Sequence, residues 1–290
     1  MLKILVLGAN GQLGRCFADQ VALLDASVRL AGRADVDITD DVSLRHALQL
    51  FGPDIVINAG AYTLVDEAEI NKEEARLVNH IAVANLAHAC SDFNCWLIHI
   101  STDYVFDGEA FNPYLESCET NPKSEYGLSK LNGELAIQAS DCQHLIIRTS
   151  WVFSEYGSNF MKTMLRVGST NAQLSIVDDQ IGCPTYAQHL AHSVVCLLPR
   201  LLEANSFSGI YHYCGSDECS WYDFAQVIFE KARHLGFKVP DHIIPIKTEA
   251  YPTPARRPKY SSLNTDKFFN TFGISAPDWK AGVDNVFSKI

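Results

Sequence analysis

The side chains best suited to moving a proton lie between residues 101 and 130. Ser101 and Thr102 form a hydroxyl pair, and Tyr126 precedes Lys130 by four positions. Two residues at that spacing share one face of a helix. A neighbouring ammonium lowers the pKa of a tyrosine, whose ordinary value is about 10. We therefore expect Tyr126 to exchange a proton with a substrate oxygen that Thr102 or Ser101 also holds.

A tyrosine and a lysine four positions apart are common, and an exposed pair on a helix is the usual explanation. Here the pair follows an apolar strand, predicted at 96–100, that ends in the Ser-Thr hydroxyls. Ligands of open α/β sheets bind at the carboxyl ends of such strands. The pair therefore indicates redox chemistry if the chain also binds a cofactor that carries hydride.

A glycine loop near the N-terminus predicts that cofactor site. Residues 3–15 read KILVLGANGQLGR, an apolar strand followed by three glycines and the start of a helix. Glycine lets the backbone approach a phosphate closely, and the helix N-terminus attracts its charge. The spacing differs from the commonest dinucleotide fingerprint, so a glycine-rich turn in another α/β fold is the alternative. The predicted cofactor-binding residues of the loop are Gly8, Asn10, Gly11, Gln12, Leu13 and Gly14.

The end of the second predicted strand bears on the choice of cofactor. An acidic residue there binds the 2'-hydroxyl of NAD, whereas this chain has Arg33. Arg33 can face the 2'-phosphate of NADPH, although a plain surface arginine is the alternative, so NADPH or NADH stays open. After the third strand, the small residues Ala59, Gly60 and Ala61 allow a cofactor to lie across the sheet. A tight turn explains that tripeptide equally well.

Strand and helix patterns alternate along the first half of the chain. We expect helices over about 41–51 and 73–90, with His99 packed in the core. Alternation of this kind predicts an α/β fold with a Rossmann-like doubly wound parallel sheet. After residue 150 the segments become shorter and more mixed. We expect an NAD(P)-binding domain at 1–150, and a smaller mixed α/β domain at 151–290 that mainly binds substrate, with residues around 175–205 packing back on the first. The predicted strands are 4–7, 28–31, 55–58, 96–100 and 145–148.

Composition narrows the class of partner and the compartment. The 290 residues carry a formal net charge of -11, which argues against nucleic acid as a partner. The nine cysteines include no C-x-x-C pair, which is typical of a reduced, cytoplasmic protein rather than of a zinc site or a disulfide framework. The sequence shows neither a signal peptide nor an apolar run long enough for a membrane span.

Five further stretches complete a pattern that resembles a known family. They read STDYVFDG at 101–108, YGLSKLNGE at 126–134, RTSWVF at 148–153, DDQIGCPTY at 178–186 and RRPKYSSLN at 256–264. Together with the glycine loop they resemble the extended short-chain dehydrogenase/reductases, and within them the dTDP-4-dehydrorhamnose reductase family. The resemblance spans nearly the whole chain.

The resemblance implies a reaction and assigns roles. NAD(P)H would deliver hydride to the C4 ketone of dTDP-4-dehydro-L-rhamnose, a step of dTDP-rhamnose biosynthesis for cell-surface polysaccharide. Tyr126 would protonate the oxygen, and Lys130 would bind the nicotinamide ribose and tune Tyr126. The resemblance also implies that Thr102, Asp103 and Trp151 contact the nucleotide-sugar, that Asp37 and Ile38 touch the adenine side of the cofactor, and that Asn79 lines the cofactor site.

Several alternatives stay open. Arg256 and Arg257 are candidates for the substrate diphosphate, with Arg257 preferred, but a solvated basic turn explains them too. Similar sugar-nucleotide dehydratases have a glutamate where this chain has Tyr104, which favours reduction over dehydration; packing is the alternative role of Tyr104. Another nucleotide-sugar reductase, an epimerase, or a regulatory subunit like the β subunit of methionine adenosyltransferase fits the same residues.

A metal is doubtful. The family includes metal-bridged dimers that use carboxylates near the C-terminus, whereas the last six residues here, Asn-Val-Phe-Ser-Lys-Ile290, carry no carboxylate side chain. A homodimer is one of the oligomeric states that the sequence leaves open.

Overall fold

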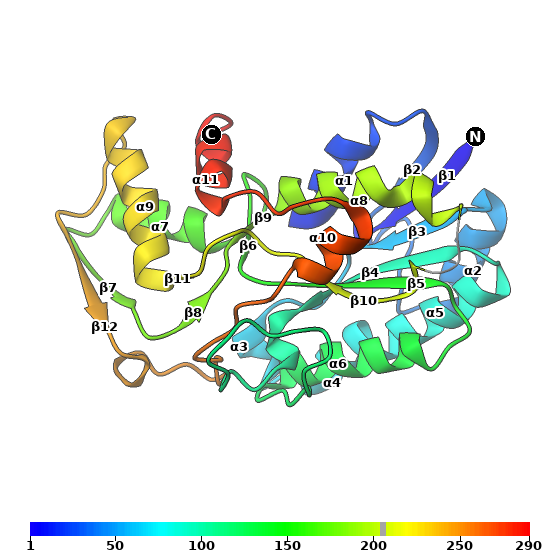
Figure 1. Ribbon diagram of the computed structural model, residues 1–290, viewed down its shortest axis with the longest axis horizontal. Coiled ribbons are helices and arrows are strands. Elements are labelled where there is room, and N and C mark those ends of the chain that lie inside the picture. Colours follow the sequence, from blue (N-terminus) through cyan, green and yellow to red (C-terminus); the bar gives the residue numbers. More distant parts are fainter. Residues whose placement is uncertain (204–206) are drawn as a thin grey trace.

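The fold is built on a six-stranded parallel sheet (Figure 1). The computed structural model describes residues 1–203 and 207–290. Every neighbouring pair in the sheet is parallel, in the order β10-β5-β4-β3-β1-β2. The strands are β1 (Leu2–Leu7), β2 (Ala26–Ala31), β3 (Ile55–Asn58), β4 (Trp96–Thr102), β5 (His144–Thr149) and β10 (Gly209–His212). The predicted parallel α/β fold is confirmed.

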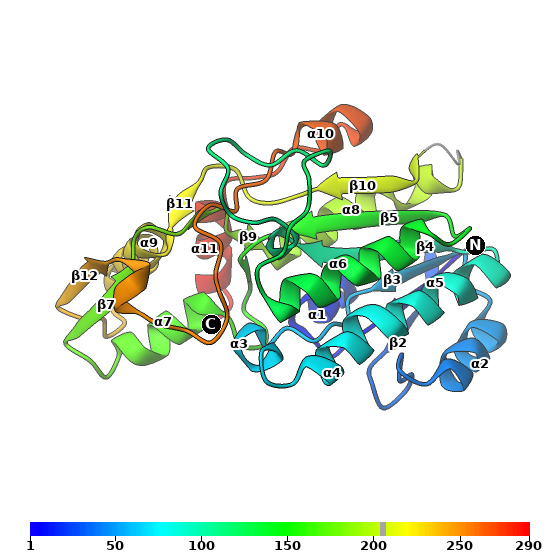
Figure 2. The ribbon, with the colours of Figure 1, turned by 90° about the horizontal axis from the view of Figure 1, so that it is seen from below.

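Helices cover both faces of the sheet, so its central strands are apolar throughout. Side chains of a strand alternate between faces. Ile4 and Val6 pack with Phe17 on one face, whereas Leu5 and Leu7 pack on the other. Figure 2 shows the second face in front. The first face carries α1 (Gln12–Val21), α8 (Ala187–Leu201) and α10 (Asp266–Phe272); the second carries α2 (Asp41–Phe51), α5 (Ala82–Asp92) and α6 (Glu125–Gln138).

The helix predicted at 73–90 contains a π-helical turn. It begins as α4 (Lys72–Arg76), widens in η1 (Leu77–Ile81), and continues as α5. Asn79, in this turn, accepts a hydrogen bond from the Tyr62 backbone N–H and donates to its carbonyl oxygen. Such turns occur often at functional sites. Here the turn fastens the loop that follows β3, next to the short helix α3 (Val65–Ala68).

After residue 150, part of the chain returns to the parallel sheet and part forms a separate packed region beside it. β10 pairs with β5, and α8 packs on α1. The remaining segments enclose an aromatic core around Phe153, Phe224 and Trp279. We retain the division near residue 150 as a proposal. These segments are β6 (Val152–Phe153), α7 (Phe160–Gly168), β7 (Gln173–Val177), β8 (Ile181–Gly182), β9 (Thr185–Tyr186), β11 (Cys219–Ser220), α9 (Trp221–His234), β12 (His242–Ile246), η4 (Thr248–Ala250) and α11 (Trp279–Phe287).

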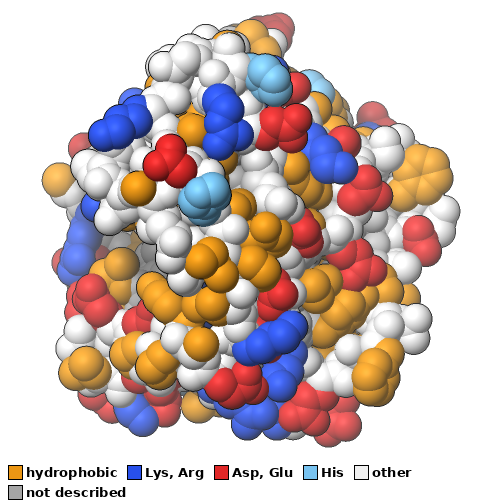
Figure 3. Space-filling view, turned by 90° about the vertical axis from the view of Figure 1, so that its left-hand side faces the viewer, with side chains coloured by type: hydrophobic (Ala, Val, Ile, Leu, Met, Phe, Trp, Pro, Cys, Tyr) orange, Lys and Arg blue, Asp and Glu red, His pale blue; other side chains and the backbone are white. Residues whose placement is uncertain are grey.

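The end of the molecule that carries α9, β7 and β12, on the left in Figure 1, has a surface that mixes hydrophobic side chains with charges of both signs (Figure 3). Within residues 1–203 and 207–290, no helix combines the length and the apolar character needed to cross a membrane.

A buried ion pair joins α6 to the sheet. The Arg148 guanidinium on β5 donates through Nε and Nη2 to the Glu134 carboxylate on α6, with Nη2 at 2.7 Å. Their side chains are 3% and 0% exposed. Ser101, on β4, donates its hydroxyl to the same carboxylate. Since α6 carries Tyr126, this cluster fixes where that phenol lies relative to β4.

Replacing the cation of this pair should strongly destabilise the fold. In Arg148→Leu, the Glu134 carboxylate stays buried without its partner, which costs about 3–5 kcal/mol. Urea unfolding at neutral pH measures the loss. Arg45→Leu is the control, because Arg45 forms exposed pairs with Asp41 and Asp92 and should lose less than about 1 kcal/mol. Equal unfolding midpoints for the two variants would contradict the role given to Arg148.

Candidate active site

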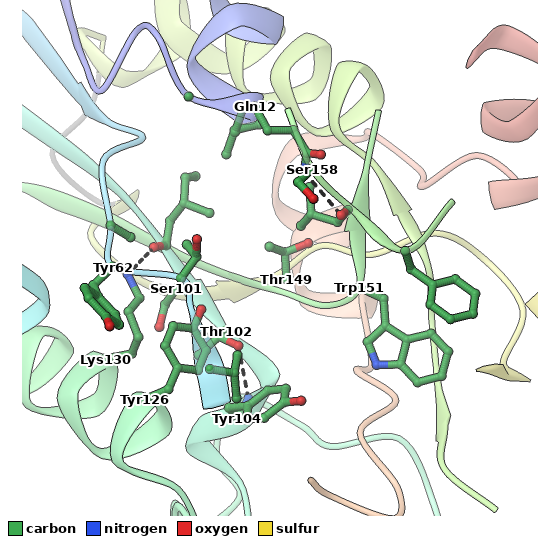
Figure 4. Close-up of a pocket in the computed structure, with 18 of the residues that line it drawn as sticks. Gln12, Tyr62, Ser101, Thr102, Tyr104, Tyr126, Lys130, Thr149, Trp151 and Ser158 are labelled. Carbon is green, nitrogen blue, oxygen red and sulfur yellow. Dashed lines mark hydrogen bonds between the residues drawn. The ribbon is translucent and has the colours of Figure 1, made fainter. Parts of the chain in front are cut away.

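A cavity of about 900 Å³ lies at the carboxyl ends of the parallel strands. Side chains that follow residue 150 line its other side, among them Trp151 (Figure 4) and Trp221. Of the site residues predicted from the sequence, those that line the cavity are Gly8, Asn10, Gly11, Gln12, Leu13, Arg33, Asp37, Ile38, Ala59, Gly60, Ala61, Ser101, Thr102, Asp103, Tyr126, Lys130, Trp151 and Arg257. Gly14 lies behind the glycine loop and Asn79 behind Tyr62.

The glycine loop has the shape that a dinucleotide pyrophosphate requires. Gly8 has a φ of 72°, and a Cβ there would lie 2.5 Å from the Gly60 nitrogen. A Cβ on Gly14 would lie 2.1 Å from the Gly8 oxygen, so only glycine lets α1 approach the loop. No side chain caps the N-terminus of α1 at Gly11. Its first N–H groups are therefore available to phosphate oxygens, and the loop fits a nicotinamide dinucleotide.

At the rim, one cation and one carboxylate lie side by side. The Arg33 side chain is 76% exposed, and its Nε is 3.4 Å from an Asp37 carboxylate oxygen. Hydrogen bonds from the Thr39 hydroxyl and backbone N–H lower the pKa of Asp37. Thr39 donates to one oxygen of Asp37 and the Arg33 Nε to the other, while the rest of the exposed Arg33 side chain lines the cavity.

Tyr126 is a buried phenol at the centre of the cavity. It projects from α6 toward Thr102 at the end of β4 (Figure 4). Burial raises the pKa of Tyr126, a hydrogen bond with Thr102 opposes the rise, and the Asp103 carboxylate adds to it. We expected Lys130 to lower this pKa, but burial outweighs every other effect in this geometry. Tyr126 is therefore a protonated phenol, the form that can donate a proton.

Lys130 lies one helical turn along α6 and is also buried. Its Nζ donates to the Ile100 carbonyl oxygen at 2.7 Å and lies 3.1 Å from Nε2 of His99. Burial lowers the pKa of Lys130 to about 8, and Glu134 acts in the opposite direction. His99, expected only to pack in the core, is completely buried but contacts this ammonium or amine directly.

Asp103 follows Thr102 and is buried with it. It accepts a hydrogen bond of 2.9 Å from the Thr102 hydroxyl, which also accepts from the Tyr104 N–H. Burial raises the pKa of Asp103 to about 6, although the hydrogen bond from Thr102 lowers it. The site thus combines a neutral phenol, a hydroxyl and a carboxylate that resists ionisation.

Tyr104 and Arg257 form one side of the cavity. The Tyr104 ring packs edge-on against Tyr126, with centroids 5.5 Å apart. Arg257 donates to the Tyr104 hydroxyl at 3.3 Å and forms an ion pair with Asp66 at 2.7 Å. Arg257 therefore reaches the cavity, but Asp66 already holds part of its guanidinium.

Two tryptophans form a flat apolar wall opposite Tyr126. The Trp151 and Trp221 rings stack with centroids 3.5 Å apart and 6° between their planes. Trp151 has a φ of 47°, and Gly182 leaves room for its ring. The Trp221 indole donates to the Gln180 side-chain oxygen at 3.1 Å. Sequence reasoning missed Trp221, whose only signal was an aromatic residue directly after the helix-capping Ser220.

A parallel sheet, a glycine loop at its first strand and a buried Thr-Tyr-Lys group at the strand ends define the short-chain dehydrogenase/reductase class. The model of the family described as RmlD substrate binding domain matches residues 2–290. The chain belongs to this family.

Relatives that match the chain over its full length support this family assignment. The dTDP-4-dehydrorhamnose reductase of Escherichia coli (strain K12) is 38% identical, covering 100% of this chain and 98% of the relative. A crystal structure of such a reductase from Clostridium acetobutylicum has a TM-score of 0.92 at 38% identity, covering 99% of both chains. The Bacillus anthracis enzyme, solved in complex with NADP, has a TM-score of 0.90 at 33% identity, covering 100% of both chains.

A metal has no comparable support. Among the residues that the structure describes, no cluster of three or more His, Cys, Asp or Glu side chains is suited to holding a metal ion.

The pKa of Asp103 should be visible in the stability of the protein. Because the folded-state pKa lies above the ordinary value of about 3.9, the folded protein binds this proton more tightly than the unfolded chain. The free energy of unfolding of the wild type relative to Asp103→Asn should therefore fall by roughly 3 kcal/mol as pH rises from about 4 to about 6, then stay level. Urea unfolding across this range measures it.

Asp107→Asn provides the opposite sign as a control. A hydrogen bond from Tyr114 lowers the pKa of Asp107, so this contribution to stability is present near neutral pH and is lost as pH falls. A wild-type stability that does not change with pH relative to Asp103→Asn would show that Asp103 is not held in a desolvated site.

Proposed function

We propose that this protein reduces the C4 ketone of dTDP-4-dehydro-L-rhamnose to dTDP-L-rhamnose with NADPH as hydride donor. The observation that carries the proposal is the buried, protonated phenol of Tyr126 beside Thr102, in the cavity that the glycine loop opens into. Relatives named for this reaction match the chain over its full length, one of them in complex with NADP.

The residues divide the work of a reduction between them. Bound NADPH supplies a hydride to the C4 carbon. The ketone oxygen then takes up a proton, which the Tyr126 hydroxyl donates. The Thr102 hydroxyl, which donates to Asp103 in the structure, rotates to donate to that oxygen as negative charge develops. Lys130 holds the cofactor ribose, and the N–H groups at the start of α1 hold its pyrophosphate.

Position 104 supports reduction rather than dehydration. Eliminating water requires an additional acid or base beside the Ser-Thr pair. Tyr104 instead packs on Tyr126 and accepts a hydrogen bond from Arg257. Burial raises the pKa of the Tyr104 hydroxyl to about 12, so this phenol does not serve as a base near neutral pH.

The nucleotide part of the substrate is assigned to the wall opposite Tyr126. A stacked pair such as Trp151 and Trp221 presents a flat apolar face to a base or a sugar. Arg257 lines the same cavity, beside Tyr104, and supplies a cation for a diphosphate, although it shares its charge with Asp66.

We also place the protein in the cytoplasm. All nine cysteines are free thiols, eight of them buried or half-buried, which supports a reducing compartment. A nucleotide-sugar substrate supports the same location.

The Tyr126→Phe variant tests the assigned proton donor. Without the hydroxyl, kcat with dTDP-4-dehydro-L-rhamnose should fall by about 10²–10⁴, the usual contribution of a general acid. The Kd for NADPH should stay close to that of the wild type. NADPH oxidation and cofactor titration measure the two quantities.

Tyr213→Phe is the matched control. Its hydroxyl is buried and accepts a hydrogen bond from Ser193 away from the cavity, so its loss should leave kcat unchanged. A Tyr126→Phe enzyme that turns over at the rate of this control would rule out Tyr126 as the donor.

Arg33→Ala tests the preference for NADPH. Removing an exposed cation that meets the 2'-phosphate should raise the Kd for NADPH by about tenfold, or about 1.4 kcal/mol. The Kd for NADH should not change, since NADH lacks that phosphate. Titration of both cofactors measures the ratio, with Arg45→Ala as an exposed control outside the cavity. An equal loss for both cofactors would mean that Arg33 does not read the 2'-phosphate.

A further inference from the structure

His99 is a buried ionisable residue without a role in the reaction described above. It lies on β4 between Asn58, on the adjacent strand β3, and Lys130, on α6. Its Nδ1 is 3.1 Å from the Asn58 amide nitrogen, and its Nε2 is 3.1 Å from Nζ of Lys130. All three side chains are at most 2% exposed. Their hydrogen bonds must therefore be satisfied among themselves and the surrounding backbone.

The direction of each hydrogen bond follows from Gly60. Its backbone N–H, which can only donate, lies 3.1 Å from Oδ1 of Asn58. The Asn58 amide nitrogen therefore faces His99 and donates to Nδ1. A neutral imidazole whose Nδ1 accepts carries its proton on Nε2. Gly60 in turn packs directly on Gly8, so the glycine loop anchors this orientation.

The proton on Nε2 points at Lys130. An ammonium group offers only donors, so it cannot accept from a second N–H. An amine has a lone pair that accepts from Nε2 and still donates to the Ile100 carbonyl oxygen, its other contact at 2.7 Å. The arrangement is therefore satisfied by neutral Lys130 and conflicts with charged Lys130.

We propose that His99 is a positioning residue that holds Lys130 as a neutral amine until the anionic cofactor binds. When NADPH binds, Lys130 takes up a proton from solvent and turns from His99 to the ribose, where its ammonium lowers the barrier to proton loss from Tyr126. The inference rests on the proposed contact of Lys130 with the cofactor. The positive charge of Lys130 would therefore form only when the anionic cofactor binds.

The electrostatic surroundings support this state. The ionisable groups near Lys130 are Tyr126 and Glu134 on α6, His99 on β4 and Tyr62 after β3. Glu134, the one that favours a charge on Lys130, is neutralised by Arg148 on β5. Burial lowers the pKa of Lys130 to about 8, and burial together with Lys130 lowers that of His99 far below its ordinary value.

The first test reads the His99 tautomer by ¹⁵N NMR of the histidine-labelled protein without cofactor. We expect the proton on Nε2. His212 is an internal reference of the opposite kind, because its Nδ1 faces the Tyr114 carbonyl oxygen and must donate. A His99 protonated on Nδ1, or on both nitrogens, near neutral pH would overturn the proposal.

The second test uses the pH dependence of NADPH binding. Burial already lowers the pKa of Lys130 to about 8, and the Nε2 proton of His99 opposes the charge further. Each complex should therefore take up one proton at neutral pH, so the Kd should already rise about tenfold per pH unit between about pH 7 and 8, and a Kd that is level over this range would contradict the proposal. In Asn58→Asp the carboxylate accepts from both Gly60 and His99, which moves the imidazole proton to Nδ1 and turns Nε2 into an acceptor for the ammonium. The rise in Kd should then begin at least about one unit higher.

His212→Gln is the control, since it also replaces a buried histidine of the sheet but lies away from Lys130; its profile should match the wild type. An Asn58→Asp profile identical to the wild type would contradict the proposal. Neither measurement requires turnover. A protein with this tautomer and this pH profile but no activity on the sugar nucleotide would retain the role of His99 and lose the proposed function.

Discussion

The geometry of the site depends on the buried contact between Glu134 and Arg148. Two opposite charges removed from water bind each other with little freedom, since any displacement leaves one of them unpaired. The contact lies between α6 and β5, and Ser101 extends it to β4. The phenol and the amine of the site come from α6, whereas the hydroxyl of Thr102 comes from β4. One ion pair therefore sets the distance between the groups that must act on a single oxygen atom.

Burial is the second constraint, and it acts on charge rather than on position. Tyr126 and His99 are held neutral, and Asp103 is more easily protonated than an exposed aspartate. The ions that remain charged, such as Arg33 and Arg257, lie at the rim or in a partnered pair. Once a ligand displaces water from such a cavity, the few cations and backbone dipoles that remain act on its charge more strongly than they would in water. The acidic protein thus binds an anionic cofactor through backbone dipoles and a few local cations.

The parts that sequence reasoning found are those whose signal is local. The central strands appear as apolar runs because both faces of the sheet are covered, and the glycine loop appears because its backbone excludes any Cβ. The strand Gly209–His212 was not predicted, since four mixed residues become a strand only beside β5. Trp221 and the partner of Arg257 were missed for the same reason: Asp66 lies far away in the chain, and only the folded structure brings the two together. The tautomer of His99 depends on three separate elements and has no sequence signal.

The π turn at 77–81 limits how the length of this helix can change. An α-helix advances about 100° per residue, and a π turn accommodates one residue more than an α-helical turn does. Deleting a single residue would restore regular α-helical winding and remove the widened turn that presents Asn79 to the loop after β3. Asn79 would then no longer reach the Tyr62 backbone. The number of residues in this helix is therefore constrained by the loop that it holds, and not only by the helix's own hydrogen bonds.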